Sequence, residues 1–117
     1  MALKPVRTLP SLPEPPEHLS GDPARLWRDT VAEFDLEAHQ IALLGAACDA
    51  LARMLEARDL VNVQGPVVTD SRGGVKAHPA VAIERDSRLG FARLIRELAL
   101  DVPVPDTRPV RRGGQVS

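Results

Sequence analysis

The sequence predicts an all-α fold in which a short N-terminal helix precedes a long antiparallel helical hairpin. Three observations support this prediction. Apolar residues recur at steps of three and four in three separate segments, which is the period of an amphipathic helix. Two of these segments open with a proline, Pro23 and Pro79, and proline is favoured at the first helical position because its missing N–H needs no partner there. Most of the other prolines lie near the two chain ends, outside these segments.

The first helix is expected within the stretch "SGDPARLWRDTVAEF". Asp22 is a suitable N-cap residue, because its side chain can accept a hydrogen bond from a free backbone N–H of the first turn. Pro23 follows at the first helical position, and Arg25 and Arg28 lie away from the apolar face. That face consists of Leu26, Trp27, Thr30, Val31 and Phe34.

The second helix is expected over about residues 37–61. One apolar line follows steps of three and four and ends in a leucine-rich stretch: Ile41, Leu44, Cys48, Leu51 and Leu55. A second line runs beside it: Leu43, Ala47, Ala50 and Met54. Together they form a stripe too broad for one partner helix. The small residues Gly45, Ala46 and Ala47 would let a neighbouring backbone approach closely, and Cys48 is interpreted as core packing.

The third helix is expected over about residues 79–99, and its length is similar to that of the second, which favours an antiparallel hairpin. Three pairs of opposite charge at i,i+4 spacing are predicted on the two helices: Asp49–Arg53, Glu84–Arg88 and Arg93–Glu97. The long connection contains Val67 and Val68, the turn signal "DSRGG" and then Val75, a pattern that allows a short β-hairpin.

The two ends of the chain are predicted to be flexible arms. Residues 1–19 and 101–117 are rich in proline, which cannot donate a backbone hydrogen bond and keeps its predecessor out of the helical region. We therefore expect residues 20–100 to form the folded domain, with a Pro-rich arm before it and a tail after it.

Composition argues against an enzyme, a membrane protein and a disulfide-rich secreted protein. No nucleotide-binding glycine loop and no metalloprotease motif occurs, and the three histidines lie far apart in sequence. We expect no catalytic residue, no metal and no cofactor. The single cysteine excludes an internal disulfide, and without a signal peptide or a membrane-length apolar run the chain is expected to be soluble and cytoplasmic.

The formal net charge of −1 means that any DNA contact must come from local basic groups or from many copies acting together. Basic residues in flexible segments can contact phosphates, since this needs only charge and reach. They can equally serve solubility. The DNA-binding candidates are Lys4, Arg7, Arg25, Arg28, Arg72 and Lys76.

The order of features resembles the phage terminase small subunit, in particular the short family encoded by tailed double-stranded DNA phages and prophages. The resemblance rests on "PEPPEHLS", "ARLWRDTVAEF", "CDALARMLEA", "KAHPAV" and "FARLIRELAL", and it covers about residues 13–100. The sequential combination is more specific than any piece alone. Unlike several small terminases, the chain has a proline-rich arm and one helix where a helix-turn-helix would stand.

The resemblance implies a non-enzymatic component of a DNA-packaging motor, which binds viral DNA and recruits and regulates the ATPase and nuclease of the large subunit. It also implies a homo-oligomeric ring held by the helical hairpin. The candidate residues for the oligomer interface are Leu43, Ala47, Ala50, Met54, Arg88, Phe91 and Leu94. The tail could dock the large subunit through Val102, Val104, Arg108, Arg111 and Arg112, with valines in small pockets and arginines on carboxylates or phosphates.

Two other classes of protein remain compatible with the sequence. A small oligomeric DNA-binding regulator would also be helical, but it should show a helix-turn-helix with a basic recognition helix. A helical adaptor that does not bind DNA would fit the net charge of −1 better.

Overall fold

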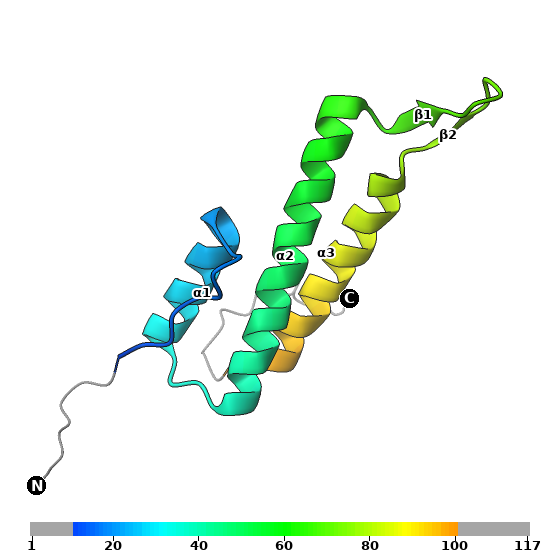
Figure 1. Cartoon of the computed structure of the whole chain (residues 1–117). Helices are drawn as coiled ribbons and strands as arrows, with labels where there is room; N and C mark the ends of the chain where they lie inside the picture. The colour runs from blue at the N-terminus through cyan, green and yellow to red at the C-terminus, as the bar shows by residue number, and fades with distance from the viewer. Residues whose placement is uncertain (1–10, 101–117) are drawn as a thin grey trace, which may run out of the picture.

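The computed structural model describes residues 11–100 of the chain. In order, these residues form α1 (Gly21–Glu33), α2 (Ala38–Gln64), β1 (Val67–Thr69), β2 (Val75–Ala77) and α3 (Pro79–Leu98). α2 and α3 pack as an antiparallel hairpin, and α1 packs against α2, so that α2 lies between the other two helices (Figure 1). The predicted all-α fold with a helical hairpin and a small β-hairpin is confirmed.

The start of α1 differs from the prediction. Ser20 occupies the cap position and the helix begins at Gly21, so the prediction that Asp22 is the N-cap is wrong. Asp22 lies instead in the first turn, where a carboxylate interacts favourably with the positive end of the helix dipole. It forms an ion pair with Arg25 at 2.9 Å.

α2 begins with a capping box and continues three residues further than predicted. The Glu37 side chain accepts from the backbone of the third helical residue, Gln40, while the Gln40 side-chain oxygen accepts the Glu37 N–H at 3.0 Å. The helix stops at Gln64, because Gly65 has a φ of +88°, which turns the chain out of the helical conformation. The Gln40 amide also donates to the Leu98 carbonyl at 3.4 Å, which connects the start of α2 to the end of α3.

The broad apolar stripe of α2 is explained by partners on two sides. Leu44 and Cys48 pack in one cluster with Trp27 and Val31 of α1 and with Leu98 of α3. A second buried line on α2 consists of Ala47, Ala50, Met54 and Ala57. Ala50 of this line borders a groove with residues of α3, so the second line faces the hairpin partner.

Cys48 is fully buried, as expected for a packing residue. Burial raises the pKa of its thiol to about 11, and the negative charge of neighbouring Asp49 adds to this effect. The thiol is therefore protonated at neutral pH, and the reactive thiolate form is disfavoured.

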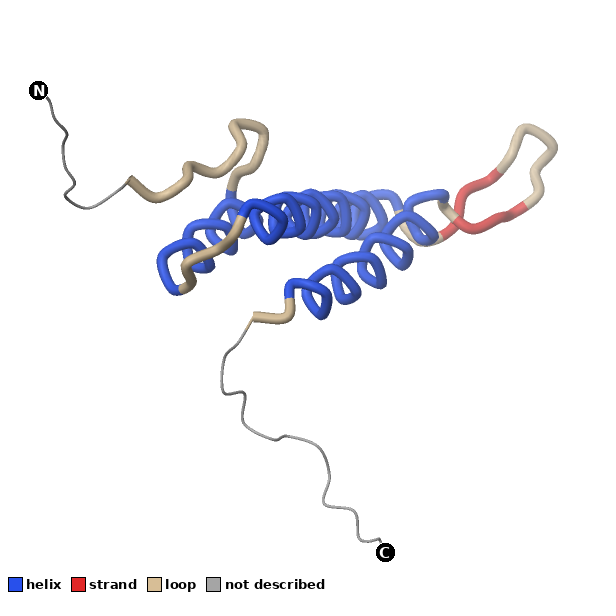
Figure 2. The backbone as a smooth tube through the Cα atoms, turned by 90° about the horizontal axis from the view of Figure 1, so that it is seen from below, coloured by secondary structure: helices blue, strands red, loops and turns tan. Residues whose placement is uncertain are grey.

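The β-hairpin extends beyond the helix ends (Figure 2). Val67 pairs with Ala77 and Thr69 with Val75, and the His78 N–H donates to the Pro66 carbonyl at 2.8 Å. The turn is held by Asp70, whose carboxylate accepts the N–H groups of Arg72 at 2.9 Å and Gly74 at 2.8 Å. Gly73 has a φ of +82°, and a Cβ at Gly74 would lie 2.9 Å from the Asp70 carboxylate, so both glycines suit this turn.

Three residues before α1 contact the helices, although most of residues 11–20 are exposed. Leu19 is buried in the core, the Trp27 indole N–H donates to the Pro13 carbonyl at 3.0 Å, and His18 contacts Asp49 at 2.6 Å. Within the predicted N-terminal arm, Leu19 therefore packs into the helical core, because its apolar side chain has surface to bury. None of the helices in residues 11–100 is long and apolar enough to cross a membrane.

Candidate contact surface

Within residues 11–100, no three His, Cys, Asp or Glu side chains are grouped so that they could hold a metal ion. The histidines have separate local environments. His18 contacts the Asp49 carboxylate. His78 Nδ1 accepts the Ala80 N–H at 2.9 Å and so caps α3, while His39 is exposed. Each of these positions is accounted for by a local contact or by solvation.

The cations predicted to contact DNA lie on separate parts of the molecule. Arg25 and Arg28 are exposed on α1, whereas Arg72 and Lys76 lie in the β-hairpin, which extends from the far end of α2 (Figure 1). The structure does not bring these two groups together. Among residues 11–100, Arg25 pairs with Asp22, while the other three form no ion pair. Two further candidates, Lys4 and Arg7, lie outside the described residues.

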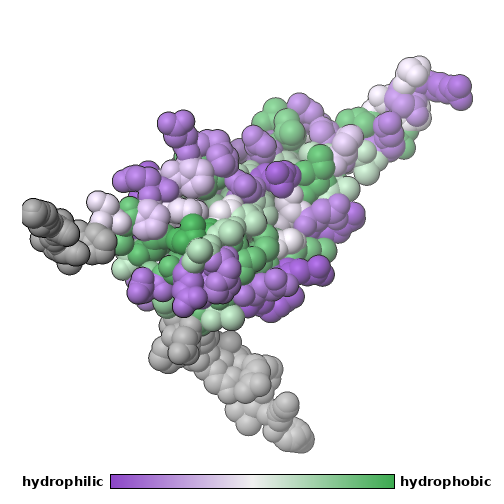
Figure 3. Space-filling model, turned by 60° about the horizontal axis from the view of Figure 1, so that its bottom comes forward, coloured by the Kyte–Doolittle hydropathy of each residue, from purple (hydrophilic) through white to green (hydrophobic). Residues whose placement is uncertain are grey.

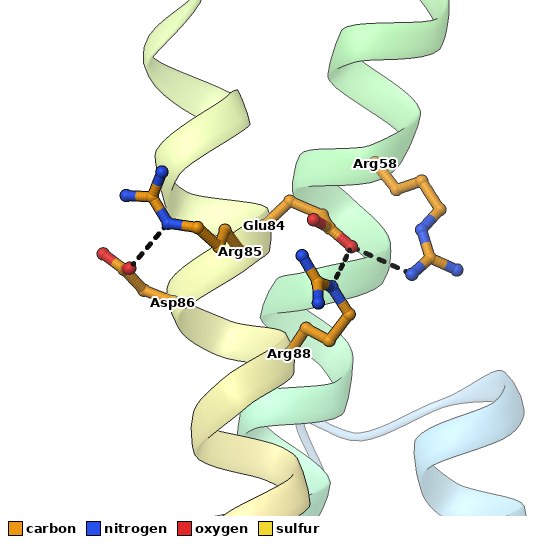
Figure 4. Close-up of polar contacts among 5 residues, drawn as sticks. All are labelled: Arg58, Glu84, Arg85, Asp86 and Arg88. Atoms are coloured by element: carbon orange, nitrogen blue, oxygen red, sulfur yellow. Dashed lines mark hydrogen bonds and ion pairs between the residues drawn. The ribbon is translucent and has the colours of Figure 1, made fainter.

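A charged cluster joins α2 to α3, and we call Arg58, Glu84 and Arg88 the arginine cluster (Figure 4). Arg58 Nη2 lies 2.9 Å from Glu84 Oε2, and Arg88 Nε lies 3.4 Å from the same oxygen. The Glu84 side chain is 19% exposed, while both arginines are about half exposed. The hydrogen bond from Arg58 lowers the pKa of Glu84, and the positive charges of both arginines lower it further, so this carboxylate is ionised at neutral pH.

The predicted pair Glu84–Arg88 is confirmed by this cluster. The other two predicted i,i+4 pairs do not form within the described part of the chain, where Asp49 contacts His18 instead of Arg53. The contribution of Arg58 could not be predicted from spacing, because spacing along one helix relates only residues of that helix.

The candidate interface residues fall into three groups. Ala47, Ala50 and Met54 are buried within the single chain, although Ala50 also lines an open groove beside α3. Leu43, Phe91 and Leu94 are half-buried, and Arg88 is exposed in the arginine cluster. The five tail residues proposed to dock the large subunit, 102, 104, 108, 111 and 112, lie outside the described residues.

Two open grooves border the contact between α2 and α3. The first, which we call the small-residue groove, has a volume of about 340 Å³ and is lined by Ala50, Arg53, Ile83, Asp86, Ser87 and Gly90. The second has a volume of about 230 Å³ and lies beside the arginine cluster, with Val61, Asn62 and Val81 in its lining. On the face shown in Figure 3, apolar residues form a strip between hydrophilic ones. The open grooves suit contact with another macromolecule better than enclosure of a small one.

These features are typical of a small all-α protein that contacts other macromolecules through exposed charged groups and open grooves. A sequence model of the phage terminase small subunit matches residues 24–104. Because this match covers more than half of the chain, the protein belongs to the phage terminase small subunit family, as its sequence predicted. Membership supports a role in the packaging of phage DNA, and the family is generally non-catalytic. No curated protein and no solved structure matches the chain.

Proposed function

We propose that the protein is the DNA-recognition component of a phage packaging motor in the cytoplasm of the bacterial host. It assembles as a homo-oligomeric ring, binds viral double-stranded DNA at the packaging site and brings that DNA to the large subunit. There it regulates the ATPase and the nuclease of the large subunit. The observation that carries this proposal is the family match over residues 24–104.

Exposed cations support contact with DNA phosphates. Arg28 on α1 and Arg72 and Lys76 in the β-hairpin form no ion pair with other residues of 11–100, so their charges are available to an anionic partner. A net charge of −1 makes a single copy a weak DNA binder. A ring repeats each basic group, and repeated weak contacts add up to useful affinity.

The small core supports self-association. Among the described residues, twelve apolar side chains are buried, and five of these belong to alanines, which bury little area each. Large apolar side chains remain exposed on the helices, among them Ile83, Leu89 and Ile95. A small domain with such a core gains stability when copies cover each other's apolar surface.

A gel-shift titration tests the DNA contact. We expect the wild-type protein to bind packaging-site duplex more tightly than a scrambled duplex, with an affinity that falls steeply as salt rises. Replacing Lys4, Arg7, Arg25 and Arg28 together with alanine should weaken binding and flatten the salt dependence. Asp29→Ala, which removes an exposed acid from α1, is the matched control and should not weaken binding.

The proposal fails if the wild-type protein shows no affinity for either duplex and leaves the ATPase of the large subunit unchanged. Binding that is insensitive to salt would contradict phosphate contact as the source of the affinity.

A further inference from the structure

The two grooves lie on opposite sides of the helical hairpin. Each residue of an α-helix is rotated by about 100° around the helix axis relative to the one before it. Glu84 and Asp86 are two residues apart, so a rotation of about 200° separates them and they point to nearly opposite sides of α3. Glu84 borders the groove beside the arginine cluster, whereas Asp86 borders the small-residue groove. Figure 4 shows the order of the three helices reversed relative to Figure 1, which places the arginine cluster on the side turned away in Figure 1.

The small-residue groove has room that the single chain does not use. Ala50 and Ser87 are buried at its floor, and Gly90 lies beside them in the middle of α3. A Cβ placed on Gly90 would meet no atom within 4 Å, so packing inside the chain does not require glycine there. Glycine inside a helix is destabilising relative to alanine. A glycine at this position leaves room for close approach of a surface from outside the chain.

Each side of the hairpin also exposes a large apolar side chain next to charged ones. Ile83 borders the small-residue groove and is 45% exposed. Ile95 is 39% exposed, and its spacing from Glu84 and Arg88 places it on the side of the arginine cluster. A partner that covers these two faces must therefore offer apolar surface together with charge, as a protein does and a nucleic acid backbone does not.

Each of the two faces carries a charged group that can pair with one on the other face. The arginine cluster holds two guanidinium groups around one carboxylate, which leaves a net charge of +1 and several N–H donors free of Glu84. The small-residue groove is lined by one cation, Arg53, and one anion, Asp86. The Asp86 side chain is 72% exposed and contacts only Arg85, at 3.5 Å, among the ion pairs of residues 11–100. An arginine from outside can share this carboxylate.

From these features we infer that the occupant of the small-residue groove is the arginine-cluster face of a second copy of this chain. Arg58 or Arg88 of one copy then approaches Asp86 of the next, and Ile95 covers the floor beside Gly90. Because the two surfaces differ and lie on opposite sides of one hairpin, the contact is head-to-tail and can repeat until a ring closes. The inference rests on the proposed homo-oligomeric ring and specifies which surfaces meet in it.

The test is the mass of full-length variants by size-exclusion chromatography with light scattering, at one protein concentration. Gly90→Leu should fill the groove and reduce the mass to that of a monomer. Its helical circular dichroism should be unchanged, because position 90 has open space in the single chain. Asp86→Arg should also dissociate the ring, since it would face Arg58 and Arg88. The double variant Asp86→Arg with Arg88→Asp should recover the larger mass.

Glu56→Arg is the matched control, because Glu56 is exposed on α2 and has no ion pair among the described residues. It should keep the wild-type mass. If the wild-type protein is a monomer, the proposed ring and this inference both fail. If it is a ring and both Gly90→Leu and Asp86→Arg keep its mass, the ring stands and the inference is overturned. If Gly90→Leu loses helical signal, the two charge variants test the inference instead. The inference then requires that Asp86→Arg dissociates the ring and that the double variant restores the mass of the ring.

Discussion

Trp27 connects three parts of the molecule. Its side chain is buried in the cluster with Leu44 and Leu98, and its indole N–H donates to the Pro13 carbonyl at 3.0 Å. The ring also lies 3.8 Å from the position that a Cβ on Gly45 would occupy. The helical period was enough to predict that Trp27 faces the core. It could not predict the Pro13 contact, because residues before α1 have no periodic pattern from which a position can be inferred.

Trp27→Ala should therefore lower the free energy of unfolding by about 3–5 kcal/mol, the usual cost of removing a large buried aromatic side chain. Trp27→Phe should cost less, because it keeps most of the packing and loses the hydrogen bond to Pro13. Urea unfolding followed by circular dichroism, at matched protein concentration, measures both. Val63→Ala, at the exposed end of α2, is the control and should change little. Equal midpoints for Trp27→Ala and Val63→Ala would show that Trp27 does not anchor the core.

Glu84 makes the stability of the helical hairpin depend on pH. The hydrogen bond from Arg58, with the charges of both arginines, lowers its pKa below the ordinary value of 4.5. The folded state thus favours the ionised form, and this contribution to stability is complete above the unfolded-state pKa and is lost as pH falls through the lower folded-state pKa. Glu84→Gln should be less stable than wild type at pH 7. The difference in free energy of unfolding should shrink below pH 4.5.

Thermal unfolding of both proteins between pH 3 and pH 7 measures this difference. Glu97→Gln is the control, because Glu97 is exposed on the same helix and has no ion pair within residues 11–100. A difference between wild type and Glu84→Gln that does not change with pH would mean that the ionised carboxylate is not the source of the effect.

At the scale of elements, the start of α3 was predicted correctly, whereas the start of α1 and the end of α2 were not. Pro79 is the first residue of α3, the position that proline chemistry favours, but Pro23 is the third residue of α1 and not the first. The end of α2 was placed at residue 61, although the helix continues to Gln64. The last three residues of the helix, Asn62, Val63 and Gln64, are largely exposed. They do not continue the apolar pattern of α2, so the pattern ends before the helix does. The stop itself comes from Gly65, whose φ of +88° suits glycine.

The β-hairpin is an element specified by its turn more than by its packing. Asp70→Ala removes the carboxylate that accepts two backbone N–H groups, at Arg72 and Gly74. Each such hydrogen bond is worth about 1 kcal/mol, and a two-stranded hairpin is marginal alone, so the strands should open more often. We expect faster amide hydrogen exchange in residues 67–77 and nearly unchanged exchange in α2 and α3. Ser71→Ala, at the exposed turn, is the control. Uniform acceleration in all elements would contradict this local role.

At the scale of the whole molecule, the sequence predicted that α2 needs more than one partner but not which partner covers which side. Helical periodicity determines the width of an apolar stripe. The neighbour on each side depends on how residues 34–37 turn the chain, which brings α1 onto α2. The same limit applies to the candidate site. The contact between Arg58 and Glu84 depends on how α2 and α3 are aligned by the β-hairpin that joins them. It therefore could not be predicted from the sequence and was found only in the structure.

The tail after Leu100 is the part of the proposed function that can be separated most cleanly from the fold. Leu98 is buried in the core cluster and Leu100 packs against it, so a chain that stops after Leu100 keeps these contacts. Residues 101–117 lie outside the described residues. Their valines and the arginines Arg108, Arg111 and Arg112 fit a segment that orders on a partner.

Truncation after Leu100 should therefore leave the oligomer mass and the melting temperature nearly unchanged, while it weakens binding to the large subunit and reduces the stimulated ATPase activity. A full-length variant with alanine at Arg108, Arg111 and Arg112 is the matched comparison. It should reproduce much of the loss if charge drives docking, and little of it if the valines do. Light scattering, thermal unfolding and a steady-state ATPase assay measure the three effects. If the truncated protein stimulates the large subunit as strongly as the full chain, docking must use the helical body, where the open grooves beside α3 offer the alternative surface.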